Sequence, residues 1–215
     1  MLCFSCATAP KPASDRLTEV QAKSWLARYC SAGPRELSGS LVLQANTREF
    51  KGQHPASVHF EPSGRFTLEV THILGGTLLR LSSDGISGLD SEIPSRPKLN
   101  RKGVKTYMGL EMPVLRDLLQ GDLPCPKAWK AARIELNGPE IRISSGPWRW
   151  TFFGAIEKDQ RIPYRITLSS GEVMDPNRDI DLKIEEWDEA RHFAKKVRIH
   201  TSEGDLKWIW RDRNS

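Results

Sequence analysis

The chain has 215 residues, of which 38% are hydrophobic and 27% are charged. This length corresponds to about one domain, and the composition excludes an intrinsically disordered acidic or basic chain. No apolar run approaches the roughly 18 residues that a helix needs to cross a bilayer, so we expect no transmembrane helix. The formal net charge of +5 is small, and the densest basic stretch, residues 98–105, has no interleaved aromatic residue. We therefore expect no nucleic-acid partner.

The first residues resemble the end of a bacterial lipoprotein signal, in which a cysteine becomes the lipidated first residue of the mature protein. Cys6 follows the small residue Ser5 and precedes a stretch rich in Pro, Ala and Ser that is typical of a flexible tether. Cys3 stands where such signals usually have leucine, and no charged region with a long apolar run comes before it, so Met1 would lie inside the signal. We expect residues 1–14 to be a signal remnant and lipid-anchor tether, the alternative being a plain tail with two idle thiols.

The remaining cysteines are Cys30 and Cys125. Cys3 and Cys6 form a C-x-x-C pair, but no second pair and no strand–helix pattern accompanies it, which argues against a zinc or redox site. If Cys6 is lipidated, Cys30 and Cys125 lie in an oxidising compartment, where they either form a disulfide or stay free. Their spacing in the sequence leaves both outcomes open, because a disulfide depends on the distance between the two Cα atoms.

The apolar residues predict one helix followed by many short strands. Helical spacing over residues 14–29 is carried by Leu17, Val20, Trp25, Leu26 and Tyr29. From residue 41 to residue 210, apolar and polar residues alternate instead, in about eleven or twelve short segments separated by turn residues. Each segment has one apolar face. This pattern predicts a large antiparallel sheet that curls around an apolar interior as a barrel or half-barrel.

The spacing of apolar residues changes between residues 99 and 123. Residues 104–108 suit a short helix ended by Gly109, and a leucine-rich helix would begin at Pro113 and end at Gly121. Since these helices interrupt the sheet, we expect them to lie on its apolar face as a lid, together with the N-terminal helix.

The sequence contains no motif that indicates catalysis. The five histidines show no metal-ligand spacing, and the chain has no nucleophile elbow, P-loop or dinucleotide-binding fingerprint. Most acidic residues lie on the polar face of a predicted strand, as Asp181 and Glu185 do. We therefore expect no enzyme activity, no metal and no cofactor.

One predicted hairpin loop, residues 72–76, breaks the usual pattern. Its two glycines suit a turn, but Ile73 and Leu74 occupy positions where a loop is normally polar. Exposing two adjacent aliphatic side chains forgoes about 1.5–3 kcal/mol of burial free energy for each, so such a pair indicates contact with lipid or a partner. In the alternative interpretation the loop folds back and buries both residues.

Several segments resemble the LolB family of outer-membrane lipoprotein receptors. Residues 66–81 resemble a strand, loop and strand in which the family carries an exposed leucine followed by glycine, at the positions of Leu74 and Gly75. Residues 109–113 and the leucine-rich helix after them are similar to the family's lid segment, although the helix is shorter. The last strands of the family are matched in order and spacing by residues 148–152, 162–168 and 182–187.

The resemblance covers residues 15–187, and it leaves residues 188–215 as a C-terminal extension with an extra strand pair. It implies an unclosed half-barrel with a helical lid around a hydrophobic cavity that accepts acyl chains. The protein would be a monomer, lipid-anchored through Cys6 in the outer membrane and facing the periplasm. It would accept lipoproteins from a LolA-like periplasmic carrier and insert them into the outer membrane.

Three groups of residues would perform this function. The residues expected to line the acyl-chain cavity are Phe66, Leu68, Val70, Leu79, Leu81, Trp150 and Phe152. The residues expected in the lid are Leu110, Met112, Leu115 and Leu118. Ile73, Leu74 and Gly75 would form the membrane-insertion loop. For the cavity and lid residues, ordinary core packing is the alternative. Rival functions are a non-catalytic envelope assembly lipoprotein with the same fold and, less favoured, a small-lipid carrier or enzyme.

Overall fold

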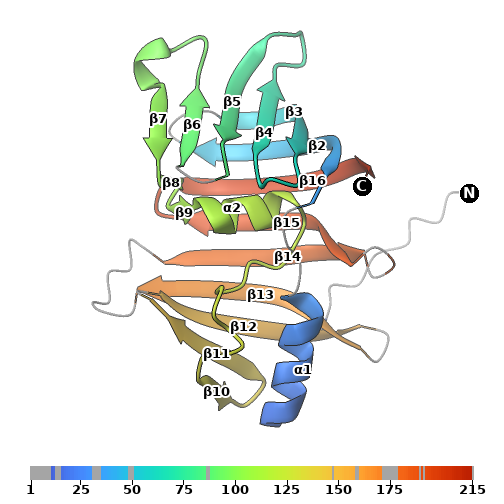
Figure 1. Cartoon of the computed structure of the whole chain (residues 1–215). Coiled ribbons are helices and arrows are strands. Elements are labelled where there is room, and N and C mark those ends of the chain that lie inside the picture. The colour runs from blue at the N-terminus through green and yellow to red at the C-terminus, as the bar shows by residue number, and fades with distance from the viewer. Residues whose placement is uncertain are drawn as a thin grey trace, which may run out of the picture.

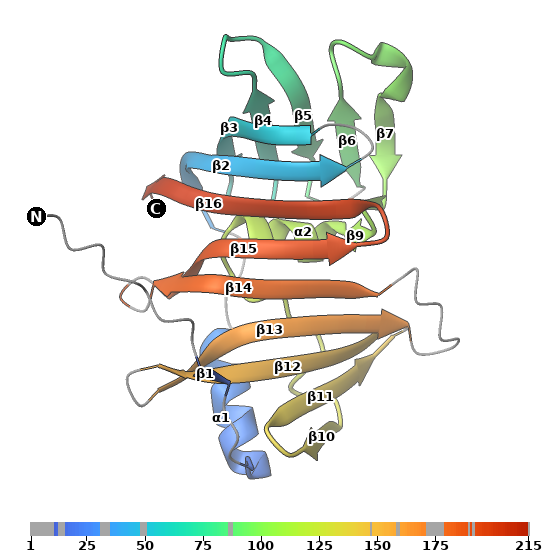
Figure 2. The same ribbon diagram turned by 180° about the vertical axis from the view of Figure 1, so that it is seen from behind.

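The computed structural model describes residues 11–12, 16–30, 35–47, 51–85, 88–146, 148–157, 160–170, 179–188, 190 and 192–214. The predicted lipid-attachment residue Cys6 lies outside these residues. Within them, the chain forms a 14-stranded sheet, a two-stranded sheet, two α-helices and one 3-10 helix (Figures 1 and 2). None of the described helices combines the length and the apolar character that crossing a membrane would require.

The helices are α1 (Glu19–Tyr29), α2 (Met112–Leu119) and the 3-10 helix η1 (Pro97–Leu99). The first strands are β1 (Lys11–Pro12), β2 (Leu37–Thr47), β3 (Lys51–Phe60), β4 (Phe66–Thr71), β5 (Thr77–Ser83), β6 (Leu89–Glu92) and β7 (Arg101–Val104). β8 (Thr106–Tyr107) and β9 (Leu110–Glu111) form the small sheet. The last strands are β10 (Ile134–Asn137), β11 (Glu140–Ser145), β12 (Trp148–Glu157), β13 (Gln160–Ser170), β14 (Ile180–Asp188), β15 (Phe193–Thr201) and β16 (Gly204–Asn214).

The large sheet is an unclosed half-barrel. Its order is β10-β11-β12-β13-β14-β15-β16-β2-β3-β4-β5-β6-β7, with β1 paired to β12. Every described strand pair is antiparallel, and β10 and β7 stand at opposite ends of the order. Both helices lie on the same face of the sheet, in front of it in Figure 1 and behind it in Figure 2. The predicted mainly-β half-barrel with a helical lid is therefore confirmed.

The C-terminal strands lie in the middle of this sheet. β15 pairs with β14 and β16, and β16 pairs with β2, so residues 193–214 connect the half formed by β2–β7 to the half formed by β10–β14. Trp208 faces Leu43 and Trp210 faces Leu41 across the β16–β2 ladder. The segment predicted as a C-terminal extension thus supplies the ladder that joins the two halves of the sheet.

One face of the sheet is apolar from strand to strand, because antiparallel partners lie on the same face. One such row consists of Phe152, Ile166, Leu182, Ile199 and Leu206, each residue directly opposite the next. All five side chains are at most 5% exposed. This buried face carries the core, and both helices cover it.

The helix predicted over residues 104–108 is wrong. Val104 ends β7, where it is opposite Leu89, and a tight hairpin follows in which Tyr107 is opposite Leu110. The two residues between them, Met108 and Gly109, have φ angles of 52° and 71°. Positive φ at both central residues is typical of a two-residue hairpin turn and cannot continue a right-handed helix.

We expect a chain truncated after Asp188 to lose its cooperative fold, because it lacks β15 and β16, the two strands that connect β14 to β2 in the sheet. The thermal unfolding transition, followed by circular dichroism, should disappear, and the chain should become sensitive to protease. A chain that lacks only residues 214–215 is the control and should unfold at close to the temperature of the full chain. A chain truncated after Asp188 that melts cooperatively at that temperature would contradict the central position of β15 and β16.

Candidate functional site

Helix α1 covers the end of the apolar face formed by β12 and β13. Its start is set by Thr18, whose hydroxyl accepts a hydrogen bond from the backbone N–H of Gln21 in a capping box. The indole N–H of Trp25 donates to the carbonyl oxygen of Arg161 at 2.9 Å. The Trp25 ring also meets the Phe152 ring edge-on, with 6.2 Å between their centroids. The predicted cavity residue Phe152 therefore lies beneath α1.

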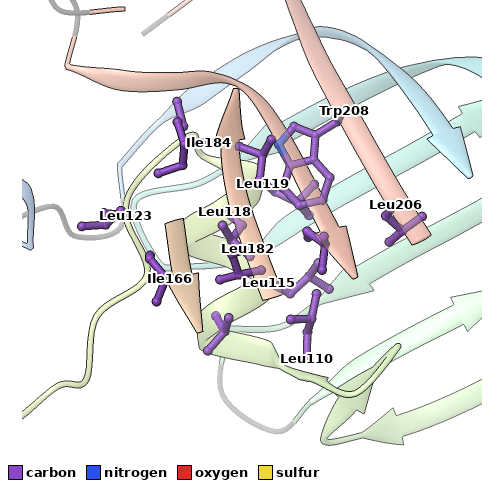
Figure 3. Close-up of a cluster of buried hydrophobic side chains, with 14 of the residues drawn as sticks. Leu110, Leu115, Leu118, Leu119, Leu123, Ile166, Leu182, Ile184, Leu206 and Trp208 are labelled. Atoms are coloured by element: carbon purple, nitrogen blue, oxygen red, sulfur yellow. The ribbon is translucent and has the colours of Figure 1, made fainter. Parts of the chain in front are cut away.

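Helix α2 covers the middle of the sheet. It is amphipathic, and its buried residues are Val114, Leu115, Leu118 and Leu119. In the close-up, these leucines point at side chains of β13, β14 and β16, among them Leu182, Ile184 and Trp208 (Figure 3). The apolar face under α2 is thus filled by side chains of the protein itself.

The C-terminal end of α2 is attached to β15. The carbonyl oxygen of Gly121 accepts a hydrogen bond from the backbone N–H of Ala194 at 2.6 Å. Gly121 has φ +77°, and a Cβ atom there would lie 2.9 Å from the side chain of Phe193. Glycine is therefore required both by the backbone conformation and by the closeness of β15.

Buried charges surround the same end of α2. Asp122 is 5% exposed, and the guanidinium of Arg35 lies 2.6 Å from its Oδ1. Asp117 pairs with Arg116, also at 2.6 Å. Burial raises the pKa of Asp117 to about 6, against the opposing charge of Arg116, and burial likewise raises the pKa of Asp122 against the opposing charge of Arg35.

Other polar atoms at this end of α2 are buried without a hydrogen bond. Both amide atoms of Gln120 and the Oδ2 atom of Asp122 have no hydrogen-bond partner among the described residues. An amide or carboxylate oxygen that is removed from water in this way costs about 1–3 kcal/mol. The end of α2 therefore combines a close attachment to β15 with polar groups that would gain hydrogen bonds if water reached them.

A disulfide links the segments that follow the two helices. Cys30 caps the C-terminus of α1, and Cys125 lies in the loop after α2. Their Cα atoms are 5.6 Å apart, and the bond closes a sequence separation of 95 residues. Of the two outcomes that the sequence leaves open for these thiols, the structure has the disulfide.

The predicted cavity residues all lie on the buried apolar face, in two separate groups. Five belong to β4 and β5, where Leu68 is opposite Leu81 and Val70 is opposite Leu79. The other two, Trp150 and Phe152, belong to β12, on the far side of β13–β16, β2 and β3 in the sheet order. Their exposed fractions run from 0% to 5%. The structure brings these residues into one core cluster but not into one local patch.

The predicted lid residues lie on two elements. Met112, Leu115 and Leu118 belong to α2, whereas Leu110 belongs to the short strand β9 and is fully buried. Leu115 and Leu118 are also buried, and Met112 is partly buried.

The loop between β4 and β5 holds its aliphatic side chains out from the protein. Ile73 is 76% exposed and Leu74 is 89% exposed. The loop is a closed turn, because the N–H of Gly75 donates to the carbonyl of His72 and the N–H of His72 donates to the carbonyl of Gly76, both at 2.9 Å. The backbone N–H of Leu74 also donates to Nδ1 of His72 at 3.1 Å. These exposures exclude the interpretation in which the loop folds back and buries both residues.

Sequence reasoning missed the residues of β16 that face α2. Trp208 is 1% exposed and Leu206 is 5% exposed, and Trp208 lies beside Leu119 of α2 in Figure 3. The alternation of Leu206, Trp208 and Trp210 is visible in the sequence and predicts a strand. Its position at the centre of the sheet depends on pairing with β2, and strand partners so far apart in the sequence leave no local signal.

A pocket of about 280 Å³ lies elsewhere, at the meeting point of β2, β15 and β16. Its lining residues are Gln44, Ala45, Asn46, Arg198, Asp205, Leu206 and Lys207. It contains none of the predicted site residues, and its mixed polar lining does not suit acyl chains. Among the described residues, no three or more His, Cys, Asp and Glu side chains gather closely enough to hold a metal ion.

Comparison with known proteins finds similar solved structures. One is a LolA superfamily protein from Nitrosomonas europaea, 11% identical, with a TM-score of 0.48 over 90% of this chain and 92% of that chain. A DUF1329 family protein from Desulfovibrio piger is 12% identical, with a TM-score of 0.48 over 84% of this chain and 85% of that chain. A Vibrio parahaemolyticus domain, described as an outer membrane lipoprotein-sorting protein domain, is 8% identical, with a TM-score of 0.48 over 90% of this chain and 89% of that chain. No protein-family model and no curated protein matches the chain.

We expect the stability of the protein to fall as Asp117 ionises. Because the pKa of Asp117 is about 6 in the folded protein and 3.8 ordinarily, the folded state holds this proton more tightly than the unfolded state does. That stabilisation is complete below the ordinary pKa and is lost as the pH rises through the folded-state pKa. We therefore compare the free energy of unfolding of Asp117→Asn with that of the wild type. The variant's value minus the wild-type value should rise by up to roughly 3 kcal/mol between about pH 4 and about pH 7.

Denaturant unfolding of both proteins at a series of pH values measures this difference, and titrating groups that do not interact with Asp117 cancel in the comparison. Glu203→Gln, which removes an exposed carboxylate in the turn between β15 and β16, is the control. A difference between Asp117→Asn and the wild type that stays constant with pH would contradict the raised pKa.

Proposed function

We propose that this protein binds the acyl chains of lipoproteins against its apolar sheet face and delivers them to a membrane through the loop that carries Ile73 and Leu74. The observation that carries the proposal is this loop: two adjacent aliphatic side chains, 76% and 89% exposed, stand at one end of a sheet whose apolar face is covered by two helices rather than by a second sheet. The sequence motifs that resemble LolB support the same role.

The free energies involved are compatible with a lid that opens for acyl chains. Lifting α2 would expose its four buried aliphatic residues, at a cost of about 1.5–3 kcal/mol for each. A single acyl chain of about 15 methylene groups regains about 0.8 kcal/mol per group, or roughly 12 kcal/mol. The free energy gained by burying one acyl chain thus offsets the cost of lifting α2, and a lipoprotein with several chains gains more than this cost.

In its specific form, the proposal is a lipoprotein receptor of the outer membrane. Cys6 would carry the lipid anchor, a LolA-like periplasmic carrier would deliver the lipoprotein, and the protein would act as a monomer that faces the periplasm. Transfer needs no nucleotide if each acceptor binds the acyl chains more tightly than the one before it. The residues of β4, β5 and β12 that were assigned to the cavity, and those of α2 and β9 assigned to the lid, would contact the chains after the lid opens.

A second candidate function is a non-catalytic envelope assembly module. The observation that favours it is the filled space beneath α2, where Leu115, Leu118 and Leu119 already lie on the sheet (Figure 3). In this case α2 would be a permanent part of the core, and the protein would bind partners without lipid.

Native mass spectrometry of protein purified without detergent distinguishes the two functions. The acyl-chain function predicts adducts with the masses of lipids or acylated peptides, which should disappear after extraction with organic solvent and return after incubation with lipid. A spectrum that shows only the bare chain, before and after incubation with lipid, would favour the assembly module.

Leu74→Glu should abolish the transfer of acylated protein into membranes and leave the fold intact, because the Leu74 side chain is 89% exposed. The measurement is the amount of acylated cargo that moves from the protein to vesicles in a fixed time. Val20→Glu is a matched control, since Val20 is 78% exposed and its helix, α1, lies at the opposite end of the molecule from the loop in Figure 1. Wild-type transfer by Leu74→Glu, with its melting temperature unchanged, would remove the loop from the proposed function.

A further inference from the structure

We infer that the membrane which this protein contacts is anionic, and that a basic hairpin beside the aliphatic loop binds its headgroups. The hairpin connects β6 to β7, and its residues 93–105 include Arg96, Lys98, Arg101 and Lys102. This inference rests on the proposed membrane role of Ile73 and Leu74 and adds the chemistry of the surface to which they bind.

The strand register places the two loops at the same edge of the sheet. β5 runs away from the aliphatic loop, and β6 runs back toward it, with Ser83 opposite Leu89 and Arg80 opposite Glu92. The chain that leaves β6 after Glu92 therefore emerges beside the loop of residues 72–76. Figures 1 and 2 show both connections projecting from the same end of the molecule.

The basic hairpin accounts for the whole net charge of the protein. The chain has 32 basic and 27 acidic residues. Residues 93–105 contain five of the basic residues and no acidic one, which leaves 27 of each sign in the rest of the chain. The aliphatic loop itself contains no acidic residue. A charge that is otherwise balanced is thus concentrated next to the exposed aliphatic pair, which is the arrangement that attracts a protein to an anionic bilayer.

The hairpin has a defined conformation that keeps these charges at the surface. The N–H of Leu99 donates to the carbonyl of Arg96 at 2.9 Å, and the backbone N–H of Ile93 donates to Oδ1 of Asn100 at 2.7 Å. Arg96, Lys98, Arg101 and Lys102 are all exposed. Leu99 lies between them and is 40% exposed, which adds a third aliphatic side chain to this end of the molecule.

The neighbouring carboxylates are already engaged with other groups. Glu69 accepts hydrogen bonds from Thr77 at 2.6 Å and from Arg80 at 3.2 Å, and Glu92 lies 4.0 Å from Arg80. Asp90 accepts a hydrogen bond from the backbone N–H of Gly103 at 2.7 Å. These acidic groups have partners at the base of the hairpins, and residues 93–105 themselves contain no acidic side chain.

The side chains favour a bilayer over a nucleic acid. Ile73, Leu74 and Leu99 are aliphatic, so they offer no ring on which a base could stack. In an interfacial membrane site, such residues enter the headgroup region while Lys and Arg contact the phosphates around them. Each basic residue near an anionic surface strengthens binding by about fivefold.

The experiment uses the full chain without acylated cargo and measures its co-sedimentation with two kinds of vesicle. One kind is phosphatidylcholine alone, and the other is an equal mixture of phosphatidylcholine and phosphatidylglycerol. The test variant is Lys98→Gln/Arg101→Gln/Lys102→Gln. The control is Lys127→Gln/Lys130→Gln/Arg133→Gln, which removes three exposed basic residues from the segment that leads into β10, at the other end of the sheet order.

We expect the wild type and the control to bind the anionic vesicles more tightly than the neutral ones, and rising ionic strength to weaken this binding. The test variant should bind the anionic vesicles about 100-fold more weakly, from about fivefold per charge. Equal binding to both vesicles, equal loss in both variants, or full binding by the test variant would overturn the inference. Absence of binding to either vesicle would also overturn it and would point to an acidic protein as the partner of the hairpin.

The proposed function and this inference can fail separately. A protein that carries acyl chains in native mass spectra but does not distinguish the two vesicles has the proposed function without an anionic target. A protein that binds anionic vesicles through the hairpin but carries no acyl chain has the surface described here, and the acyl-chain function is then wrong.

Discussion

The pairing of β16 with β2 is the contact on which the rest of the structure depends. It joins two sets of strands that are each hairpin-linked within themselves, and it aligns Trp208 and Trp210 with Leu43 and Leu41. Through this ladder the apolar face of β10–β14 continues into the apolar face of β2–β7. Without it, α2 would lie over an interrupted surface, and the two halves would each expose an edge strand. The last strands of the chain therefore complete the apolar surface that α1 and α2 cover.

The sheet carries apolar side chains in two different environments, buried beneath the helices and exposed in a loop. Over β12–β16 the apolar residues are covered by α1 and α2, and their burial stabilises the fold. Between β4 and β5, Ile73 and Leu74 remain mostly exposed, so their burial contributes little to folding. The proposed acyl-chain function uses both features: a covered apolar surface for the chains and an aliphatic contact with the membrane.

The sequence predicts the features that depend on neighbouring residues. Alternation with a period of two predicts the strands and their buried face, and Pro113 and Gly121 predict both ends of α2. The order of the strands is not predictable in this way, since the partners Leu41 and Trp210 are distant in the sequence. The error at residues 104–108 has a local cause: Met108 adopts φ 52°, a conformation rare outside glycine, so nothing in its residue type predicts the hairpin.

For the candidate site too, the sequence predicts the local features but not those that depend on the three-dimensional arrangement. Aliphatic residues in a glycine-containing loop predict an unusual surface, whereas the exposure of Leu74 follows only from the three-dimensional turn. The cavity residues are predicted as apolar and are buried, but their division between β4–β5 and β12 follows from the strand order. The concentration of charge at residues 93–105 is visible in the sequence. Its position beside the aliphatic loop follows only from the strand register, in which Glu92 is opposite Arg80.

The Cys30–Cys125 bond makes the two covering helices one mechanical unit. Because it ties the end of α1 to the loop after α2, α2 cannot swing away over its full length while α1 stays on β12 and β13. The end of α2 near Met112 has no covalent tie, and hydrogen bonds hold it: the N–H of Met112 donates to the carbonyl of Lys105, and the indole N–H of Trp148 donates to Glu111 at 2.8 Å. In the proposed opening these hydrogen bonds would break, and the end near Gly121 would act as the hinge. Acyl chains would enter from the side of β5–β7, which is also the side of the aliphatic loop and the basic hairpin. In the proposed function, the disulfide would thus give the opening a direction, and reduction would remove the covalent part of that constraint.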